Sequence, residues 1–313
     1  MGFAGAMVVA MMVDALVGWP SSLFARIGHP VTWLGRLISA IDAGFNREAD
    51  APGVRRAAGV AGALLVIALS IAIGWALQAL VPPGWGRLVW VGLLAWPLVA
   101  LRSLHDHVAA VAGPLRAGDI AAAREAVSRI VGRDPAALDE SGIARAAIES
   151  LAENTSDGIV APLVWGALFG LPGILGYKAI NTLDSMIGHR SERHEAFGWA
   201  AARIDDVANL IPARLTGCLF VLLASRRSEA WSCMLRDARR HRSPNAGWPE
   251  AAMAGALGIR LSGPRIYHGR VTDEPWLNAA ARDPSATDIV AALALYRRAM
   301  LLLGGLLAIL AFA

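Results

Sequence analysis

Long apolar runs separated by charged segments dominate the pattern along the chain. The clearest run covers residues 57–81, which contain no charged residue. A helix of about 20 apolar residues crosses the hydrocarbon core of a bilayer, so this run predicts a membrane-spanning helix. Similar runs predict six membrane segments, at about 3–19, 57–81, 88–101, 159–180, 207–224 and 289–313. The first has no basic stretch before it and no small-residue cleavage site, so we expect it to be retained and not removed as a signal peptide.

The run at 159–180 differs from an ordinary spanning helix. It contains Pro162 and Pro172, and glycines recur from Gly158 to Gly176. Such breaks are tolerated inside a membrane only where protein or water satisfies the freed backbone groups. We therefore expect a broken or re-entrant hairpin, in which 159–180 descends, 181–206 lies in a protein-lined cavity and 207–224 returns.

Arginine positions give the expected orientation of these segments. The only lysine is Lys178, and every other basic residue is an arginine. Arginine-rich loops stay on the cytoplasmic side by the positive-inside rule. Regions 20–56, 102–158 and 225–288 are therefore expected to be cytoplasmic. The whole chain, 1–313, is expected to form a single membrane-embedded domain.

The cytoplasmic regions carry their own local signals. Residues 102–150 are rich in alanine and predicted to be helical, with Asp119 and Asp134–Pro135 as helix starts. Residues 225–285 hold prolines and many glycines, which predict a loop-rich cap. The expected fold class is all-α: a polytopic integral membrane protein with cytoplasmic helical and loop regions.

Composition supports a membrane protein. Hydrophobic residues make up 56% of the chain and charged residues 17%, against about 25% charged in a typical soluble domain. These values exclude a disordered chain, a coiled coil, a fibrous repeat and a small disulfide scaffold. Cys218 and Cys233 lack a metal-ligand spacing and are expected to be reduced packing residues.

A first polar cluster has charged residues at four-residue intervals: Arg145, Glu149, Glu153 and Asp157. On a regular helix this spacing places them on one face. Like charges four residues apart destabilise an isolated helix by a few tenths of a kcal/mol, which a cation would offset. Mg²⁺ suits such a face, because it binds one or two carboxylates together with water and substrate phosphates. A solvated acidic face is the alternative, and spacing alone does not choose between them.

A second polar cluster follows the broken run. Ionisable groups in the hydrocarbon cost roughly 2.5–3.5 kcal/mol each, so they usually face a cavity and mark function. We interpret this cluster as a site that holds phosphates through Lys and Arg and a metal through Asp. Snorkelling side chains and internal ion pairs are the alternative. Its members are Lys178, Asn181, Asp184, Arg190, Glu192, Arg193, Arg203, Asp205, Asp206, Asn209 and Arg214.

Two shorter motifs complete the candidate chemistry. Residues 242–250, RSPNAGWPE, predict a turn followed by a helix that starts near Glu250. His29-Pro30-Val31 follows the first membrane segment, and a lone histidine is more often structural than catalytic. The phosphate-binding P-loop pattern is absent, because Tyr177 separates Gly176 from Lys178 and Ala179 follows.

Four long runs in this order resemble one known family. They are IESLAENTSDGIVAPL (148–163), GYKAINTLDSMIGH (176–189), FGWAAARIDDVANLIPARL (197–215) and SPNAGWPEAAMAGALG (243–258). They resemble the adenosylcobinamide-phosphate synthase family of cobalamin biosynthesis, the CobD/CbiB proteins, and His29-Pro30-Val31 is similar to that family's early motif. The resemblance covers essentially the whole chain.

The resemblance implies a multi-pass protein of the cell inner (cytoplasmic) membrane. It implies a ligase that joins adenosylcobyric acid to (R)-1-amino-2-propanol, or its O-phosphate, by an amide bond. The implied reaction uses ATP as co-substrate and Mg²⁺, and yields adenosylcobinamide or its phosphate. The expected partners are these substrates and the lipid bilayer, with other membrane enzymes of the pathway as candidates and no nucleic acid.

On this interpretation the polar residues have expected roles. An acyl phosphate is the expected activated acid, and one carboxylate is expected to take a proton from the amine. We expect metal to be bound by Glu149, Glu153 and Asp157, with Asp184, Asp205 and Asp206 as further catalytic carboxylates. We expect phosphates to be neutralised by Lys178, Arg193, Arg203 and Arg214, and substrates to be bound by His29, Asn154, Asn181, Asn209 and Asn245.

A signalling protein and a transporter are the alternatives to the ligase. The AmpE group of membrane proteins, with a signalling role, is a weaker resemblance and the runner-up. A transporter would also place charges in broken helices, but it usually shows two matching halves, and no second copy of 159–214 is present in the sequence.

Overall fold

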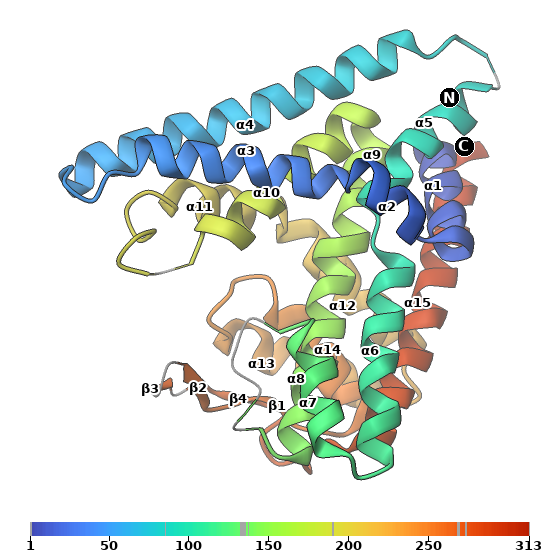
Figure 1. The fold of residues 1–313 in the computed structure, drawn as a ribbon. Helices are drawn as coiled ribbons and strands as arrows, with labels where there is room; N and C mark the ends of the chain where they lie inside the picture. Colours follow the sequence, from blue (N-terminus) through green and yellow to red (C-terminus); the bar gives the residue numbers. More distant parts are fainter. Residues whose placement is uncertain are drawn as a thin grey trace. The chain divides into compact units, whose positions relative to one another are not determined.

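The computed structural model describes residues 2–84, 86–131, 136, 138–189, 191–267, 270–272 and 274–312 (Figure 1). The described residues are mostly helical, as predicted, with a few short strands among them. The chain divides into two compact units. The first unit contains Met1–Ala100, Ala161–Asn209 and Leu306–Ala313, and the second contains Leu101–Val160 and Leu210–Gly305.

The first unit is built mainly from helices drawn from two separate parts of the sequence. They are α1 (Ala4–Val17), α2 (Ser21–Ile27), α3 (Pro30–Phe45), α4 (Pro52–Leu80), α5 (Gly86–Ala95), a 3₁₀ turn (Trp96–Leu98), α9 (Ala161–Phe169), α10 (Leu171–Ile187) and α11 (Trp199–Ala208). Helices α3 and α4 form a long hairpin, and both pack against α10 (Figure 1). The apolar core between the hairpin and α10 includes Ile38, Val66 and Leu183.

The predicted break in 159–180 is confirmed at Gly170. This residue has φ +68°, which favours glycine, and it separates α9 from α10. Pro172 lies in the first turn of α10, where its missing N–H costs nothing. Gly74 of α4 crosses the start of α10 so closely that a Cβ there would lie 2.7 Å from the Leu171 carbonyl oxygen. Glycines therefore produce both the break and the close helix crossing.

The second unit combines helices with two small antiparallel ribbons. Its helices are α6 (Leu101–Arg116), α7 (Ile120–Ser128), α8 (Glu140–Thr155), a π-helical turn (Ser156–Val160), α12 (Leu210–Leu223), α13 (Arg227–Asp237), a 3₁₀ turn (Ala238–Arg240), α14 (Gly247–Leu257) and most of α15 (Ala286–Phe312). Its strands are β1 (Leu261–Ser262), β2 (Arg265–Tyr267), β3 (Arg270–Thr272) and β4 (Trp276–Leu277), paired β1 with β4 and β2 with β3.

Two of the local predictions for this unit are confirmed. Asp119 caps α7 by accepting a hydrogen bond from the Ala122 N–H at 3.0 Å. The helix expected near Glu250 is α14, which begins at Gly247. The region 225–285 was expected to be a loop-rich cap, but it contains α13, α14 and the ribbons. The predicted helix start at Asp134–Pro135 lies outside the described residues.

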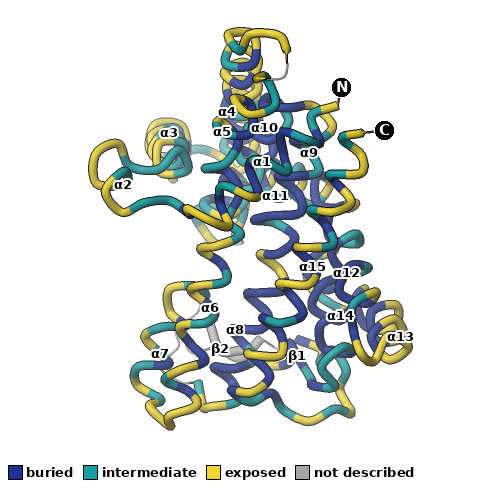
Figure 2. The backbone as a smooth tube through the Cα atoms, turned by 90° about the vertical axis from the view of Figure 1, so that its right-hand side faces the viewer, coloured by how far each residue is buried: buried dark blue, intermediate teal, exposed yellow. Residues whose placement is uncertain are grey.

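Burial differs sharply between α14 and α4. Most of α14 is buried, because small residues let its neighbours α12 and α13 approach closely (Figure 2). Helix α4 leaves large apolar side chains exposed, among them Leu64, Leu65 and Trp75. An apolar helix that stays exposed in a folded chain is suited to lipid.

Three described helices are long and apolar enough to cross a membrane: Pro52–Leu80, Gly86–Arg116 and Ala286–Phe312. Two bent pairs pass the same test when each is counted as one, Ala4–Val17 with Ser21–Phe45 and Trp199–Ala208 with Leu210–Leu223. Helices of this length and composition are typical of a multi-pass membrane protein. The side of the membrane on which each connecting region lies remains a prediction.

Candidate functional site

In the first unit, polar residues gather where α10 packs against α11. Asp184 of α10 is acted on electrostatically by His189, Asp206 and Arg203. Burial raises the pKa of the Asp184 carboxyl, and the nearby Asp206 carboxylate adds to this rise while His189 and Arg203 oppose it. Arg203 and Asp206 form an ion pair at 2.8 Å. A carboxyl of raised pKa beside other ionisable groups is suited to proton transfer.

Asn209 lies just after α11 and is completely buried. Its Oδ1 accepts a hydrogen bond from the Tyr177 hydroxyl at 2.8 Å. Its Nδ2 has no hydrogen-bond partner in the described part of the chain. Because an unsatisfied buried donor costs about 1–3 kcal/mol, this amide is a candidate to bind a ligand acceptor. Tyr177 was not among the predicted site residues, although it adjoins Lys178 in the second motif run.

The other predicted carboxylate and amide of this cluster differ in burial. Asp205 is buried and Asn181 is partly buried. Lys178 lies near enough to His29 to interact with it electrostatically. Together with Asp184 and Asn209, these residues place amide, carboxylate and ammonium groups in the first unit.

His29 has a clear structural role. Its Nδ1 accepts a hydrogen bond from the Val31 N–H at 3.2 Å, and the Thr32 hydroxyl accepts one from the His29 N–H, so the two form a capping box for α3. Its ring also contacts Trp19 edge-on. The ring also hydrogen-bonds the backbone of Pro97, so His29 serves the fold through its ring as well as through its backbone.

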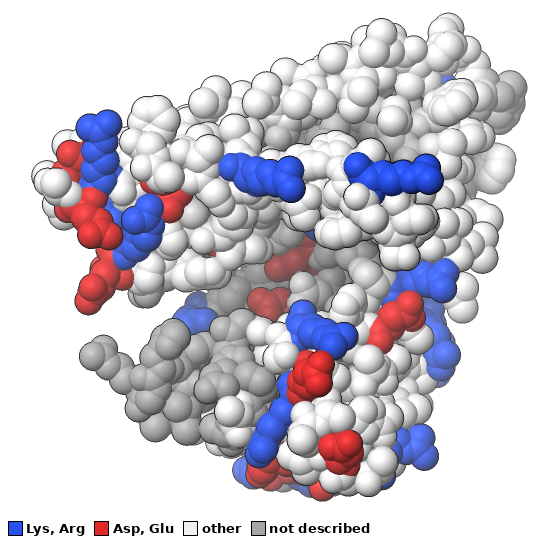
Figure 3. Space-filling model, viewed as in Figure 1, with Lys and Arg blue, Asp and Glu red and all other residues white. Residues whose placement is uncertain are grey.

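Arg193 also serves the fold. It donates to Asp42 at 2.8 and 3.0 Å and lies 3.7 Å from Glu48. Asn46 and Arg55 bind the Arg193 carbonyl oxygen, which ties this loop to the α3–α4 turn. Charged side chains are sparse over α3 and α4 and gather near this turn (Figure 3). Arg193 is therefore already neutralised by carboxylates of its own chain.

In the second unit, α8 presents the predicted acidic series. Glu149 is buried, and its Oε1 accepts a hydrogen bond from the Ser262 N–H at 2.6 Å. Ser262 has φ +59°, an unusual value for a residue with a side chain, so this charged acceptor stabilises a strained turn. Glu149 thus joins α8 to β1.

The rest of the series has a different exposure from Glu149. Glu153 is exposed, whereas Asp157 is partly buried and lies in the π-helical turn. A π turn adds a residue to the helical repeat, so the four-residue spacing does not by itself fix where Asp157 points. Asn154 donates to the Ser150 carbonyl oxygen at 2.9 Å. Arg145 pairs with Asp283 at 2.6 Å.

Metal ligands do not form a preassembled group among the described residues. No set of three or more His, Cys, Asp or Glu side chains in them could hold a metal ion. Glu149, Glu153 and Asp157 therefore do not converge as a three-ligand centre in this part of the chain. The physical reasons are the bond from Glu149 to Ser262 and the π turn at Asp157. A Mg²⁺ ion held by one or two carboxylates and substrate phosphates remains a prediction.

Arg214, predicted to neutralise phosphate, and Asn245, predicted to bind substrate, lie together in the second unit. Arg214 Nη1 lies 3.4 Å from Asn245 Oδ1, and its guanidinium stacks on Trp248 at 4.4 Å from the ring centre. A buried pair not predicted from the sequence lies nearby in the chain: His241 Nε2 is 3.7 Å from Glu250 Oε2. The sequence predicted Glu250 only as a helix start. The pair with His241 was not predictable, because burial of the two side chains is a property of the folded chain.

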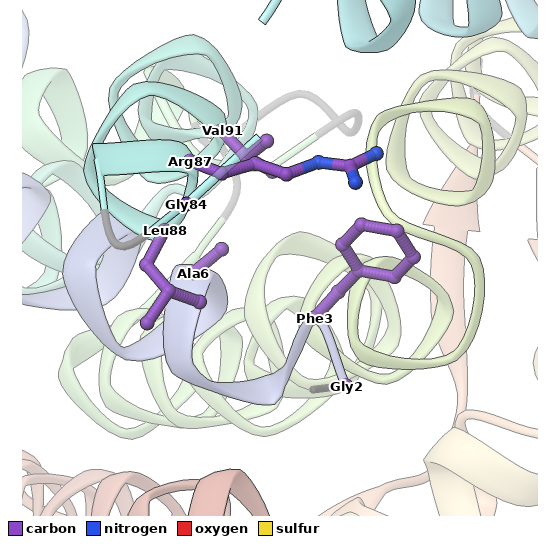
Figure 4. Close-up of a pocket in the computed structure, with 7 residues that line it drawn as sticks. All are labelled: Gly2, Phe3, Ala6, Gly84, Arg87, Leu88 and Val91. Carbon is purple, nitrogen blue, oxygen red and sulfur yellow. The ribbon is translucent and has the colours of Figure 1, made fainter. Parts of the chain in front are cut away.

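One described pocket contains none of the predicted residues. It has a volume of about 330 Å³ and lies between α1 and α5 (Figure 4). Its lining residues are Gly2, Phe3, Ala6, Gly84, Arg87, Leu88 and Val91. Apart from Arg87 these carry no ionisable side chain, so the pocket lacks the groups that amide synthesis needs.

Fold and site together define a helical, multi-pass membrane protein with buried polar groups between apolar helices. Comparison with known proteins identifies the family. The model of the family described as CobD/Cbib protein matches residues 7–296, and the chain belongs to this family. Its role is in cobalamin biosynthesis.

Relatives confirm this assignment over nearly the whole chain. The chain is 63% identical over 300 residues to "Cobalamin biosynthesis protein CobD" of Rhodobacter capsulatus, covering 96% of this chain and 95% of the relative. It is 49% identical over 303 residues to the protein of the same name from Sinorhizobium fredii, covering 94% and 92%. No solved structure matches the chain.

Proposed function

We propose that this protein is a C–N ligase acting on a corrinoid. It joins the free carboxyl group of adenosylcobyric acid to the amine of (R)-1-amino-2-propanol or its O-phosphate, and the product is adenosylcobinamide or its phosphate. The observation that carries the proposal is membership of the CobD/Cbib family across residues 7–296. The polar groups buried at α10 and α11 supply chemistry of the right kind.

The proposed reaction activates the acid before the amine attacks. ATP transfers a phosphoryl group to the corrinoid carboxylate, which gives an acyl phosphate and ADP. The amine enters as an ammonium ion and must lose a proton, because only the free amine is a nucleophile. Its lone pair then forms the C–N bond as the C–O bond to phosphate breaks. Of the two protons lost by the ammonium, one goes to a protein base and one to the departing phosphate.

In the first unit, Asp184 is the proposed base. Its raised pKa lets it hold a proton more readily than an ordinary aspartate. Asn209 Nδ2 is proposed to donate to a substrate oxygen, since this buried donor has no acceptor among the described residues. Lys178 and Arg203 are proposed to stabilise the negative charge that develops on phosphate.

Mg²⁺ would neutralise the phosphates of ATP. Oxygen donors suit this hard cation, and the proposed donors are Glu153 and Asp157, which both belong to the second unit. Glu149 is less suited, because its Oε1 already accepts the Ser262 N–H.

Genetic rescue tests the proposed function. The gene is expressed in a cobalamin auxotroph blocked at amide formation, and growth is compared with a culture supplied with cobinamide. We expect both to grow and a Lys178→Ala variant, inserted in the membrane at the wild-type level, to fail. Growth on cobinamide without growth from the wild-type gene contradicts the proposal. Mass spectrometry of the corrinoid product then shows which amino alcohol was joined.

A further inference from the structure

Among the described residues, the guanidinium of Arg214 is held through Nη1 alone. Nη1 donates to the Leu210 carbonyl oxygen at 2.7 Å and lies 3.4 Å from Asn245 Oδ1. Nε and Nη2 have no acceptor in the described part of the chain. These two atoms form the edge with which arginine binds carboxylate or phosphate through two parallel hydrogen bonds.

Trp248 fixes the plane of this guanidinium. The Arg214 side chain stacks on the Trp248 ring at 4.4 Å from its centre. The Trp248 indole N–H donates to the Pro244 carbonyl oxygen at 3.2 Å, so the ring itself cannot rotate freely. Stacking leaves the guanidinium edges available for in-plane hydrogen bonds. The open edge is therefore preorganised and does not have to be ordered by a ligand.

Hydrogen bonds within the loop that carries Asn245 fix its conformation. Ser243 Oγ accepts from the N–H groups of Asn245 and Ala246 at 3.2 and 3.1 Å. The Ser243 N–H donates to His241 Nδ1 at 3.0 Å, and His241 lies against the buried Glu250. Asn245 is itself only 5% exposed. An ordinary surface arginine has no such chain of support.

Two arginines at this place, Arg214 and Arg239, act on one another electrostatically. Neither Arg214 nor Arg239 forms an ion pair with a carboxylate among the described residues, whereas Arg236 and Arg240 both pair with Asp237. Arg239 lies close enough to act electrostatically on Arg214. Two neighbouring guanidiniums that pair with no carboxylate of the described residues match the double negative charge of a phosphate group better than the single charge of a carboxylate.

We propose that Arg214, fixed by Trp248 and Asn245 and assisted by Arg239, binds a phosphate group in the second unit. This subsite rests on the proposed function, which offers two sources for the phosphate. One is the phosphate ester of the amino alcohol, and the other is ATP. The subsite assigns new functions to Trp248 and Arg239 and makes Ser243 a positioning residue.

A binding measurement without turnover tests the subsite directly. Thermal unfolding of the detergent-solubilised protein is followed as inorganic phosphate replaces chloride at constant ionic strength. We expect phosphate to raise the unfolding temperature of the wild type and of Arg227→Gln, an exposed arginine of the same unit. Arg214→Gln should weaken phosphate binding at least tenfold. Equal phosphate stabilisation of Arg214→Gln and wild type overturns the proposal.

A second variant guards against misfolding of Arg214→Gln. Asn245→Asp keeps the acceptor for Nη1 and supplies the missing carboxylate, so it should fold and still lose phosphate affinity at least tenfold. Undiminished affinity in a folded Asn245→Asp variant counts against the subsite.

Kinetics then separate the two sources. If the ester phosphate binds here, Arg214→Gln raises KM for the phosphorylated amino alcohol at least tenfold and leaves KM for the unphosphorylated one unchanged. If ATP binds here, Arg214→Gln raises KM for ATP, whether the amino alcohol is phosphorylated or not. A fall in kcat with every KM unchanged contradicts the proposal. Wild-type protein that binds phosphate but forms no amide would refute the proposed function and leave the subsite standing.

Discussion

Asn209 is fully buried, and its two polar atoms have different surroundings. Oδ1 accepts from the Tyr177 hydroxyl, and Nδ2 has no partner in the part of the chain that the structure describes. Asn209 therefore makes a structural hydrogen bond through Oδ1 and also has a donor, Nδ2, with no acceptor among the described residues. These two roles can be separated by a double-mutant cycle.

Asn209→Ala should destabilise the protein by about 1–3 kcal/mol, because it removes the acceptor of the buried Tyr177 hydroxyl. Adding Tyr177→Phe should recover part of this loss, since it removes the stranded donor. Amide formation should stay low in both variants, because neither restores Nδ2. Unfolding in detergent and product analysis measure the two effects. Recovery of activity in the double variant would show that Asn209 acts only through Tyr177.

Asp184 is predicted to set the acidic limb of the pH profile. A base must be deprotonated to act, so activity falls as pH falls through the pKa of Asp184, which burial raises above its ordinary value of 3.8. Asp184→Asn should lower kcat about 10²–10⁴-fold. Asp206→Asn removes a like charge and should move the acidic limb of kcat/KM to lower pH. An unmoved limb in that variant, measured from pH 4 to 9 with about half-unit steps, would assign the limb to another group.

Glu149 and Glu153 should respond differently to loss of charge. Glu149→Gln weakens the charged bond to the Ser262 N–H and should lower stability by about 1 kcal/mol. Glu153→Gln leaves stability within about 0.5 kcal/mol, as exposed substitutions usually do, and should raise the Mg²⁺ concentration needed for half-maximal activity. A Mg²⁺ titration of both variants checks this. If neither alters the requirement, the acidic face of α8 is only solvated.

At the scale of elements, close helix crossings decide how the first unit packs. Helix α4 meets the start of α10 at Gly74, where the chain has just been broken at Gly170. Proline and glycine in 159–180 predicted the break. The crossing partner was not predictable, because it depends on α4, which lies about a hundred residues earlier in the sequence.

Gly74→Ala should separate α4 from α10. The new Cβ would lie 2.7 Å from backbone atoms of Leu171 and Pro172, and backbone cannot yield as a flexible side chain does. We expect a loss of about 1–3 kcal/mol. Gly53→Ala, also in α4, is the matched control, because nothing lies within 4 Å of its added Cβ. Thermal unfolding of both variants decides. Equal stability would show that the helices can move apart without cost.

At the scale of the whole molecule, membrane orientation is the main open prediction. The described helices include three candidate spans and two bent pairs. The positive-inside rule places 20–56, 102–158 and 225–288 in the cytoplasm, and it leaves 181–206 between two apolar segments. The hairpin hypothesis keeps this segment in a protein-lined cavity.

Cysteine labelling at Ser191 tests the hairpin. In a chain with Cys218 and Cys233 replaced by Ala, Ser191→Cys should resist a membrane-impermeant reagent added from the periplasmic side. A cysteine in the predicted cytoplasmic region, at the exposed Arg227, should be labelled only after the membrane is opened. Free reaction of the Ser191 cysteine in intact cells contradicts the hairpin.

The sequence alone determined the helical membrane class, the break in 159–180, several helix starts and the family. These depend on local composition, on backbone geometry near proline and glycine, and on motif runs that read in order. It also named Arg214 and Asn245 as binding residues, and they lie together.

Only the tertiary structure decided which polar groups already have partners. Arg193 faces Asp42, Glu149 faces the Ser262 N–H, and Arg145 faces Asp283, each across more than a hundred residues of sequence. The tertiary structure also left Asn209 Nδ2 and one edge of Arg214 open among the described residues. A charge or amide becomes available for a substrate only when folding brings it no partner, and spacing along the chain does not contain that information.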